Sequence, residues 1–181
     1  MVAFLVLKFM VRLNFKMNLK IKKINKDNFK NYGQIISAKG IIPKTINNNT
    51  TDSFNDLADI EIYGDDKSPR INIFKTKKRN FPIEIDMMEN HPFSSQAFIP
   101  LSKTNFIVVV APISKIPDIK LLEAFKVNPE DGINFKPKVW HFPLIATNDS
   151  NFLTIDKKDS LSNLEIYKFQ NNEKILLNYV K

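Results

Sequence analysis

The sequence contains no cysteine, and this absence excludes three kinds of chemistry at once. Without thiols the chain cannot form a disulfide scaffold, bind a metal through thiolates or use a cysteine nucleophile. The absence is compatible with a reducing compartment. Any metal site must therefore be built from histidine nitrogen and from oxygen ligands.

Glycine is also scarce, with four residues against ten prolines. Turns must then be built largely from asparagine, aspartate and proline. Long apolar runs are missing as well. The most apolar stretch, residues 1–16, is interrupted by Lys8, Arg12 and Lys16. It is too short and too charged to span a bilayer, so no membrane partner is expected.

This N-terminal stretch also lacks the features of a secretory signal, because no charged region precedes it and no small-residue cleavage site follows it. We interpret residues 1–16 as a non-native N-terminal extension, with translation starting at Met10 or Met17. Residues 17–181 are expected to form a single domain. A chain of this length is large enough to bury one hydrophobic core.

The formal net charge of +8 raises the question of nucleic-acid binding. The lysines, however, are scattered along the chain, and no RNA-binding signature or helix-turn-helix pattern accompanies them. The chain is also rich in Ile, Asn and Lys, a bias that AT-rich coding produces by itself. We therefore expect a solvated basic surface and no nucleic-acid partner.

Hydrophobic periodicity favours short strands over helices. Apolar and polar residues alternate with period two in several short runs, as half-buried strands require: 60–63, 71–74 and 83–87. Residues 105–111 form a continuous run expected to be a central strand buried on both faces. A capped helical turn is expected at 27–33, and an amphipathic helix containing Leu121, Leu122 and Phe125. The sequence thus predicts a mainly β fold, a sandwich or small barrel with one or two short helices.

Two compact patches contain the only two histidines. The first has the pattern Glu89-x-His91-x4-Gln96, and the second places His141 beside Trp140, the only tryptophan. Residues two apart on a strand point to the same face, and a proline after His91 favours extended backbone there. If the fold brings the patches together, four ligands without a thiolate meet, a set that suits Zn, Mn, Fe or Ni. The alternative is that both histidines are hydrogen-bonded core residues and Glu89 is a surface carboxylate.

The first patch also carries a family resemblance. Residues 89–101 resemble the signature of the ureidoglycolate lyase family, E-R-H-P-x-x-[ST]-Q-A-F-I-P, and the similarity continues in order on both sides. The matching segments are 46–48, 56–58, 71–82, Val139-Trp140-His141 with Pro143-Leu144, 152–156 and Asn163. The resemblance therefore spans roughly residues 17–165. A motif this long is a specific signal.

The resemblance implies a cupin-like double-stranded β-helix barrel. It also implies cleavage of (S)-ureidoglycolate to glyoxylate and urea, in allantoin and purine catabolism, by a cytoplasmic homodimer. Cupins arrange metal ligands as H-x-H-x3–4-E with a later histidine. Glu89, His91, Gln96 and His141 fall on that spacing. A divalent Ni, Mn or Zn ion is the cofactor that this ligand set implies.

The chemistry of the reaction that the resemblance implies suggests roles for individual residues. Glu89, His91 and His141 are the predicted catalytic residues, with Glu89 or His141 transferring protons and His91 and Gln96 holding metal or substrate. The predicted substrate-binding residues are Asn48, Lys75, Gln96, Trp140 and Asn163. For tryptophan, simple core packing is the alternative role. For the asparagines it is turn formation.

The chain departs from the family pattern at five positions. Ser53, Lys75, Asn90 and Lys157 stand where the family has arginine, and Phe142 replaces a second histidine. Neither lysine nor a neutral side chain reproduces a bidentate guanidinium clamp on a carboxylate. Arg79 is the sequence candidate to compensate. The alternative function is thus a non-catalytic or altered-substrate cupin-like barrel that binds a small 2-hydroxy or ureido acid.

Overall fold

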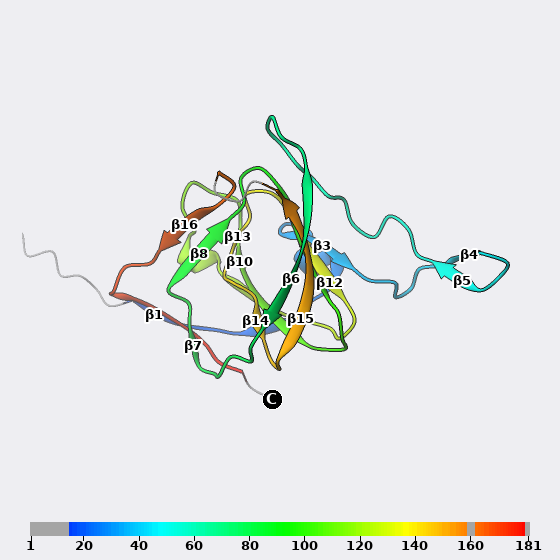
Figure 1. Ribbon diagram of the computed structural model, residues 1–181. Helices are drawn as coiled ribbons and strands as arrows, with labels where there is room; N and C mark the ends of the chain where they lie inside the picture. The colour runs from blue at the N-terminus through cyan, green and yellow to red at the C-terminus, as the bar shows by residue number, and fades with distance from the viewer. Residues whose placement is uncertain (1–14, 159–161, 180–181) are drawn as a thin grey trace, which may run out of the picture.

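The structure is a computed structural model that describes residues 15–158 and 162–179 (Figure 1). Short strands dominate it, so the predicted mainly β, cupin-like architecture is confirmed. The predicted extension 1–16 lies almost wholly outside the described residues, and the first strand begins at Phe15. No helix in the described ranges is long and apolar enough to cross a membrane.

Two large sheets build the body of the protein. One has the order β16-β8-β13-β10-β11-β2, with β14 paired to β10. Its strands are β16 (Glu165–Lys168), β8 (Met87–Asn90), β13 (Trp140–His141), β10 (Phe106–Ala111), β11 (Glu123–Val127), β2 (Ile21–Lys23) and β14 (Ile145–Ala146). The other has the order β3-β12-β9-β15-β6. Its strands are β3 (Gly33–Ile36), β12 (Gly132–Phe135), β9 (Gln96–Pro100), β15 (Ser150–Lys157) and β6 (Pro69–Thr76).

Two smaller sheets complete the described chain. The three-stranded sheet has the order β1-β17-β7 and consists of β1 (Phe15–Leu19), β17 (Glu173–Leu177) and β7 (Ile83–Glu84). The two-stranded sheet pairs β4 (Lys44–Ile46) with β5 (Thr51–Ser53). In Figure 1 this second hairpin projects well away from the barrel.

Strand β10 separates two hydrophobic cores, and all six of its residues are buried, as predicted for a central strand. Phe106, Val108 and Val110 enter the core between the two large sheets. The alternating residues Ile107 and Val109 enter the core beneath the three-stranded sheet. Burying each such side chain contributes about 1.5–3 kcal/mol. The large sheets face each other as in a cupin-like barrel, and the hydrogen bonding of the described strands leaves them open.

One predicted helix is wrong. Leu121 and Leu122 fall at a 3-10 turn, η1 (Ile119–Leu121), and its C-cap, and the chain then continues as β11. Leu122 and Ala124 enter one core and Phe125 the other. Apolar residues that alternate between two cores have the period of a strand, even where their spacing also fits one turn of helix.

The remaining elements follow the predictions with changed bounds. The capped turn is α1 (Lys26–Phe29), where the side chain of Asn25 accepts a hydrogen bond from the Asn28 amide at 2.9 Å. The strand predicted over 60–63 is reduced to an isolated bridge between Ile62 and Ser94. The run 83–87 divides into β7 and the start of β8.

Candidate metal and proton-transfer site

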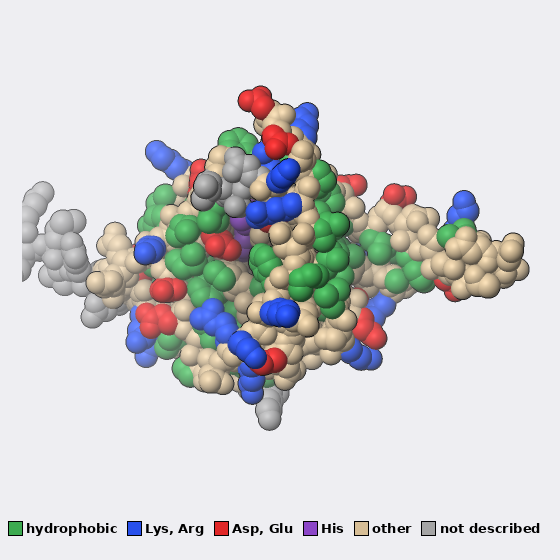
Figure 2. Space-filling view, viewed as in Figure 1, with side chains coloured by type: hydrophobic (Ala, Val, Ile, Leu, Met, Phe, Trp, Pro, Cys, Tyr) green, Lys and Arg blue, Asp and Glu red, His purple; other side chains and the backbone are tan. Residues whose placement is uncertain are grey.

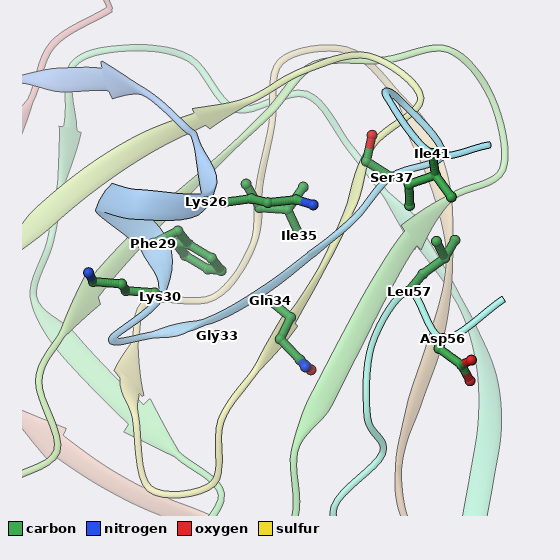
Figure 3. Close-up of a pocket in the computed structure, with 10 residues that line it drawn as sticks. All are labelled: Lys26, Phe29, Lys30, Gly33, Gln34, Ile35, Ser37, Ile41, Asp56 and Leu57. Carbon is green, nitrogen blue, oxygen red and sulfur yellow. The ribbon is translucent and has the colours of Figure 1, made fainter. Parts of the chain in front are cut away.

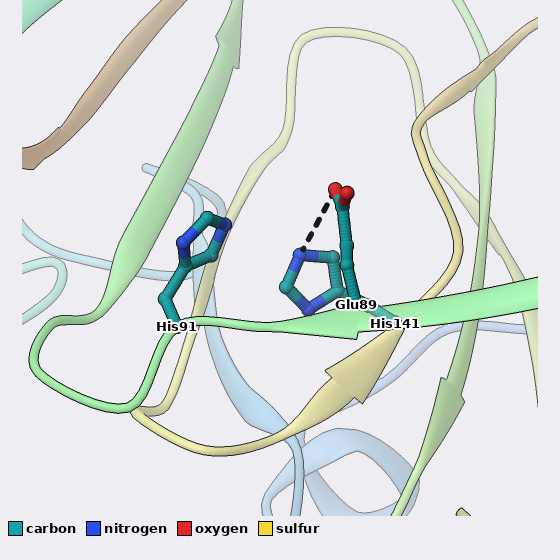
Figure 4. A group of neighbouring side chains, drawn as sticks. All are labelled: Glu89, His91 and His141. Atoms are coloured by element: carbon teal, nitrogen blue, oxygen red, sulfur yellow. Dashed lines mark ion pairs between the residues drawn. The ribbon is translucent and has the colours of Figure 1, made fainter. Parts of the chain in front are cut away.

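The two patches meet inside the barrel. On β8 and β13, Glu89 and His141 lie directly opposite each other. His141 is also paired with Val110, so both side chains share the face that Val110 presents to the core between the large sheets. His91 follows β8 two residues after Glu89. Ligand atoms of these three side chains all lie within 4.8 Å of one another (Figure 4).

His141 is held as a neutral ring with one free lone pair. It is 2% exposed and stacks on Phe135 with 4.3 Å between the ring centroids. Its Nδ1 lies 3.0 Å from the Val139 carbonyl, which can only accept a hydrogen bond, so Nδ1 carries the proton. Burial, reinforced by His91, lowers the pKa of His141 to about 3. Its Nε2 is buried without a hydrogen-bond partner.

His91 is also held as a neutral ring with its proton on Nδ1. Its Nδ1 donates to the carbonyl oxygen of Asn163 at 2.6 Å, and its Nε2 is buried without a partner. Burial lowers the pKa of His91, although the Asn163 carbonyl and the charge of Asp156 oppose the shift. The two imidazole centroids are 5.4 Å apart. Both rings therefore present an unprotonated Nε2 to the same space.

Glu89 completes a set of electron-pair donors. Its Oε1 lies 3.7 Å from Nε2 of His141. Because His141 is neutral, this contact is no ion pair but an approach of two acceptors. Burial raises the pKa of Glu89. Two imidazole lone pairs and a carboxylate that face one another require a cation or a proton between them, and this donor set fits a divalent metal.

Gln96 joins this cluster to a second polar network. Its Oε1 is buried without a partner, and its Nε2 lies 3.5 Å from Asp156. The carboxylate of Asp156 is held by the guanidinium of Arg70 through contacts of 2.6 and 3.1 Å. Asn72 adds a contact of 3.4 Å to the same carboxylate. Gln96 is thus held against a partly buried ion pair on one side of the site.

Sequence reasoning missed Arg70, Asn72 and Asp156. The available signal was their alternation, since residues two apart on β6 and β15 face the same core. Arg79, the sequence candidate to compensate for missing arginines, instead lies over the ring of Phe142, with its guanidinium carbon 5.0 Å from the ring centroid. Of the two arginines in the described residues, Arg70 is the one beside the site, where its charge acts on His91.

Of the predicted substrate-binding residues, Asn163 and Gln96 lie at the site. The Asn163 side chain accepts from the Phe93 amide at 2.7 Å and donates to Ser94 at 2.8 Å. It thereby fixes the loop that carries His91. Trp140 points into the other core and donates to the Ser114 carbonyl at 3.0 Å.

The other predicted positions lie elsewhere. Lys75 is exposed on the outer face of β6, and Asn48 lies in the turn of the β4–β5 hairpin. Ser53 is on that same hairpin. The departures Asn90, Phe142 and Lys157 each come directly after a residue that faces the site. Because neighbouring residues in extended backbone point to opposite faces, these three side chains point out of the site. Asn90 donates to Glu165 at 2.9 Å.

The site is reached from one face of the molecule. In Figure 2 histidine and acidic atoms are visible in a hollow near the centre of this face, with Lys and Arg side chains above it. A small substrate can therefore approach the cluster from solvent, and the neighbouring cations favour an anionic one.

The neutral state of His141 predicts a measurable acid sensitivity. Its pKa is about 3 when folded and about 6.5 when unfolded, so only the unfolded chain takes up this proton between those values. Stability falls as pH drops through this window. In EDTA, the free energy of unfolding should fall between pH 7 and pH 5 by about 2 kcal/mol less in His141→Phe than in the wild type. Urea denaturation at both pH values measures this, and parallel losses in the two proteins would contradict it.

Comparison with known proteins identifies the family of this chain. The family model described as Ureidoglycolate lyase matches residues 16–176. A protein of Pseudomonas paraeruginosa named ureidoglycolate lyase is 36% identical over 160 residues, which cover 88% of this chain and 95% of that protein. A Brucella melitensis protein of the same name is 39% identical over 152 residues, covering 83% and 89%. This chain belongs to the ureidoglycolate lyase family.

Proposed function

We propose that this protein is a lyase that cleaves (S)-ureidoglycolate to glyoxylate and urea. The observation that carries the proposal is the convergence of Glu89 and His91, from the family's signature segment, with His141, from a second matching segment. Both imidazole rings there present an unprotonated nitrogen without a hydrogen-bond partner. The names of the relatives from Pseudomonas and Brucella support the same activity.

The reaction needs one proton to leave the substrate hydroxyl and one to reach the departing nitrogen. The carbon–nitrogen bond breaks as the hydroxyl oxygen forms a carbonyl, so the products are an aldehyde acid and urea, with no net proton change. A positioned base and acid contribute typically about 10²–10⁴-fold each. One carboxylate near the reacting carbon can perform both transfers in turn.

Glu89 is the proposed proton carrier. The pKa of Glu89 is raised by burial, which makes its carboxylate a better base and its acid form easier to populate. His141 is a weak proton acceptor by comparison, since its pKa of about 3 keeps its Nε2 unprotonated near pH 7. Among the residues of the cluster, Glu89 therefore takes the hydroxyl proton and returns it to the ureido nitrogen.

The remaining residues bind and orient. His91, His141 and one carboxylate oxygen of Glu89 would hold a divalent metal, with Gln96 beside them, which leaves the other Glu89 oxygen for proton transfer. A bound metal supplies a Lewis acid that makes a chelated hydroxyl more acidic. The unpartnered Oε1 of Gln96 accepts a hydrogen bond from a ureido N–H. Arg70 contributes positive charge on the Asp156 side of the site.

The cellular setting is also part of the proposal and follows from the family resemblance alone. We place the enzyme in the cytoplasm, in allantoin and purine breakdown, as a homodimer. The division into an extension over 1–16 and one domain over 17–181 stays a prediction.

The deciding experiment measures urea and glyoxylate release by purified protein, after EDTA treatment and again with Ni²⁺, Mn²⁺ or Zn²⁺ added. We expect both products in equal amounts. If no product forms with any metal, while glyoxylate-like acids raise the melting temperature, the protein is the binding barrel of the alternative function. In that case the lyase proposal is wrong.

Metal binding gives a separate prediction that does not need turnover. A metal that binds only the folded protein stabilises it by about 2.7 kcal/mol at one hundred times its Kd. We expect one of the three metals to raise the melting temperature of the EDTA-treated protein. His91→Ala should abolish that increase, whereas Lys77→Met, an exposed change elsewhere, should preserve it. An equal increase in the His91 variant would contradict the ligand assignment.

A further inference from the structure

The β4–β5 hairpin, together with the legs that join it to the body (residues 38–59, here the arm), has too little structure of its own to be stable in isolation. Within the described part of the chain, β4 and β5 pair only with each other, over three residue pairs. Its side-chain contacts include Thr45 to Asp52 at 2.9 Å and Thr50 to the Asn47 carbonyl at 2.7 Å, both within the arm. An isolated two-stranded hairpin is marginal in water. The arm therefore needs a surface to lie on.

The root of the arm is firmly attached to the body. The Gln34 side chain donates to Asp59 at 2.8 Å, and Asn134 donates to the Asp59 carbonyl at 2.7 Å. A cavity of about 270 Å³ lies at this junction, where Ile41 and Leu57 of the two legs meet β3 and α1 (Figure 3). The next residue, Ile42, is 93% exposed. Beyond the root the arm leaves the body (Figure 1).

An apolar strip lies on the outer face of the adjoining sheet. Ile71 and Ile73 on the edge strand β6 are 68% and 51% exposed. Their neighbours across β15 and β9 are Ile155, Leu153 and Ile99, which continue the same face. Figure 2 shows hydrophobic side chains gathered on this side of the body. An exposed apolar row on an edge strand invites association.

We propose that the arm of one copy lies across the outer apolar strip of a second copy, reciprocally about a two-fold axis. The partner must be another molecule, because the arm points away from the body that carries its own strip. A second copy offers both surfaces, as a two-fold interface requires. The arm and strip together fall in the range of roughly 20–30 residues a side that a stable interface uses.

The exchange also brings side chains to the partner's site, a step that rests on the proposed function. From Ile41 to Asn48 the extended leg reaches about 23 Å at roughly 3.3 Å per residue. The strip lies on the outer face of β6 and β15, whose inner face holds Arg70 and Asp156. The proposal places the turn of the crossing arm at the opening of that site. The turn residues Asn47, Asn48 and Asn49 all adopt left-handed backbone, with φ of 52°, 54° and 66°, and are not buried. Their carboxamides suit a ureido group or a carboxylate.

The interface is tested by sedimentation equilibrium of the full chain. The wild type should be a dimer. Ile42→Lys and Ile71→Lys each change an exposed residue, so folding should survive, and each should weaken dimerisation at least about tenfold by placing a charge in an apolar contact. Ile116→Lys, at a residue that is 56% exposed elsewhere, is the matched control and should leave it unchanged. A monomeric wild type, or a dimer indifferent to both changes, overturns the exchange.

The placement of the turn is tested by cross-linking, which needs no turnover. The chain has no cysteine, so Asn48→Cys can carry a single benzophenone label. Irradiation should give a covalent dimer with the link in the partner's segment 89–96 or 162–166. Links only within one chain, or to other segments, overturn the placement of the turn.

Complementation then tests its contribution to the reaction. The Glu89→Gln variant has a disabled site and an intact arm. The variant with Asn47, Asn48 and Asn49 replaced by glycine has an intact site and an altered arm. After mixing and re-equilibration, random pairing makes half the dimers mixed, each with one complete site, so about a quarter of wild-type activity should return. If no activity returns although the cross-link forms, the turn residues do not take part in the reaction. If the wild type is inactive, the proposed function is wrong. The cross-linking result then tests the placement of the arm by itself.

Discussion

Replacing Glu89 with glutamine is expected to lower the rate of urea release by about 10²–10⁴-fold while leaving the fold intact. Glutamine keeps the size and hydrogen-bonding reach of the side chain but cannot accept the hydroxyl proton. Burial raises the pKa of Glu89, so its ionised form destabilises the folded state. The variant should therefore be as stable as the wild type or more stable above pH 7.

The measurement is kcat for urea release at saturating substrate, with a urea denaturation curve for each protein. Glu165→Gln is the control, because Glu165 lies on the neighbouring strand, is exposed and bonds Asn90 outside the site. It should keep nearly full activity. Full activity in the Glu89 variant would show that another group transfers the proton. Loss of the fold would be detected in the denaturation curve.

Removing the guanidinium of Arg70 should destabilise the protein by about 3 kcal/mol. Arg70→Met leaves the carboxylate of Asp156, which is 3% exposed, without its cation. Breaking a buried pair in this way costs about 3–5 kcal/mol. The lower end applies here because the Arg70 side chain is 31% exposed and partly screened by solvent. Urea denaturation at pH 7.5 measures the loss.

Two further variants separate this effect from a general loss of charge. Lys77→Met breaks the pair with Asp149, whose side chains are 88% and 61% exposed, and should leave the stability essentially unchanged because solvent screens both charges. Arg70→Met combined with Asp156→Asn should recover part of the loss, since no buried charge then remains. If both single variants lose equal stability, Asp156 does not depend on Arg70.

The same variants report on the site. Arg70 lowers and Asp156 raises the pKa of His91. Arg70→Met should therefore raise the pH at which the His91 ring titrates, as followed by NMR. Gln96 also contacts Asp156, so binding of a ureido acid should weaken in the Asp156 variant.

Periodicity predicted most strands correctly because strands with one buried face alternate visibly, and β10, buried on both faces, is continuous. It failed at Leu121–Phe125, where apolar residues supply two different cores and a helical spacing appears by coincidence. It also failed at Ile60–Tyr63. There the alternation was present, but only an isolated bridge formed with Ser94.

By itself the sequence determined the reaction class and predicted half of the candidate site. The spacing of Glu89 and His91 predicts side chains on one face of extended backbone, although the strand itself ends at Asn90. The signature segment identifies the family. Local spacing cannot show which distant strand lies opposite. Only the tertiary structure decided that His141 pairs with Glu89, that Arg70 and Asp156 stand beside Gln96, and that Asn48 lies on a projecting arm. Those contacts depend on strand register, which is set by how two cores pack at once.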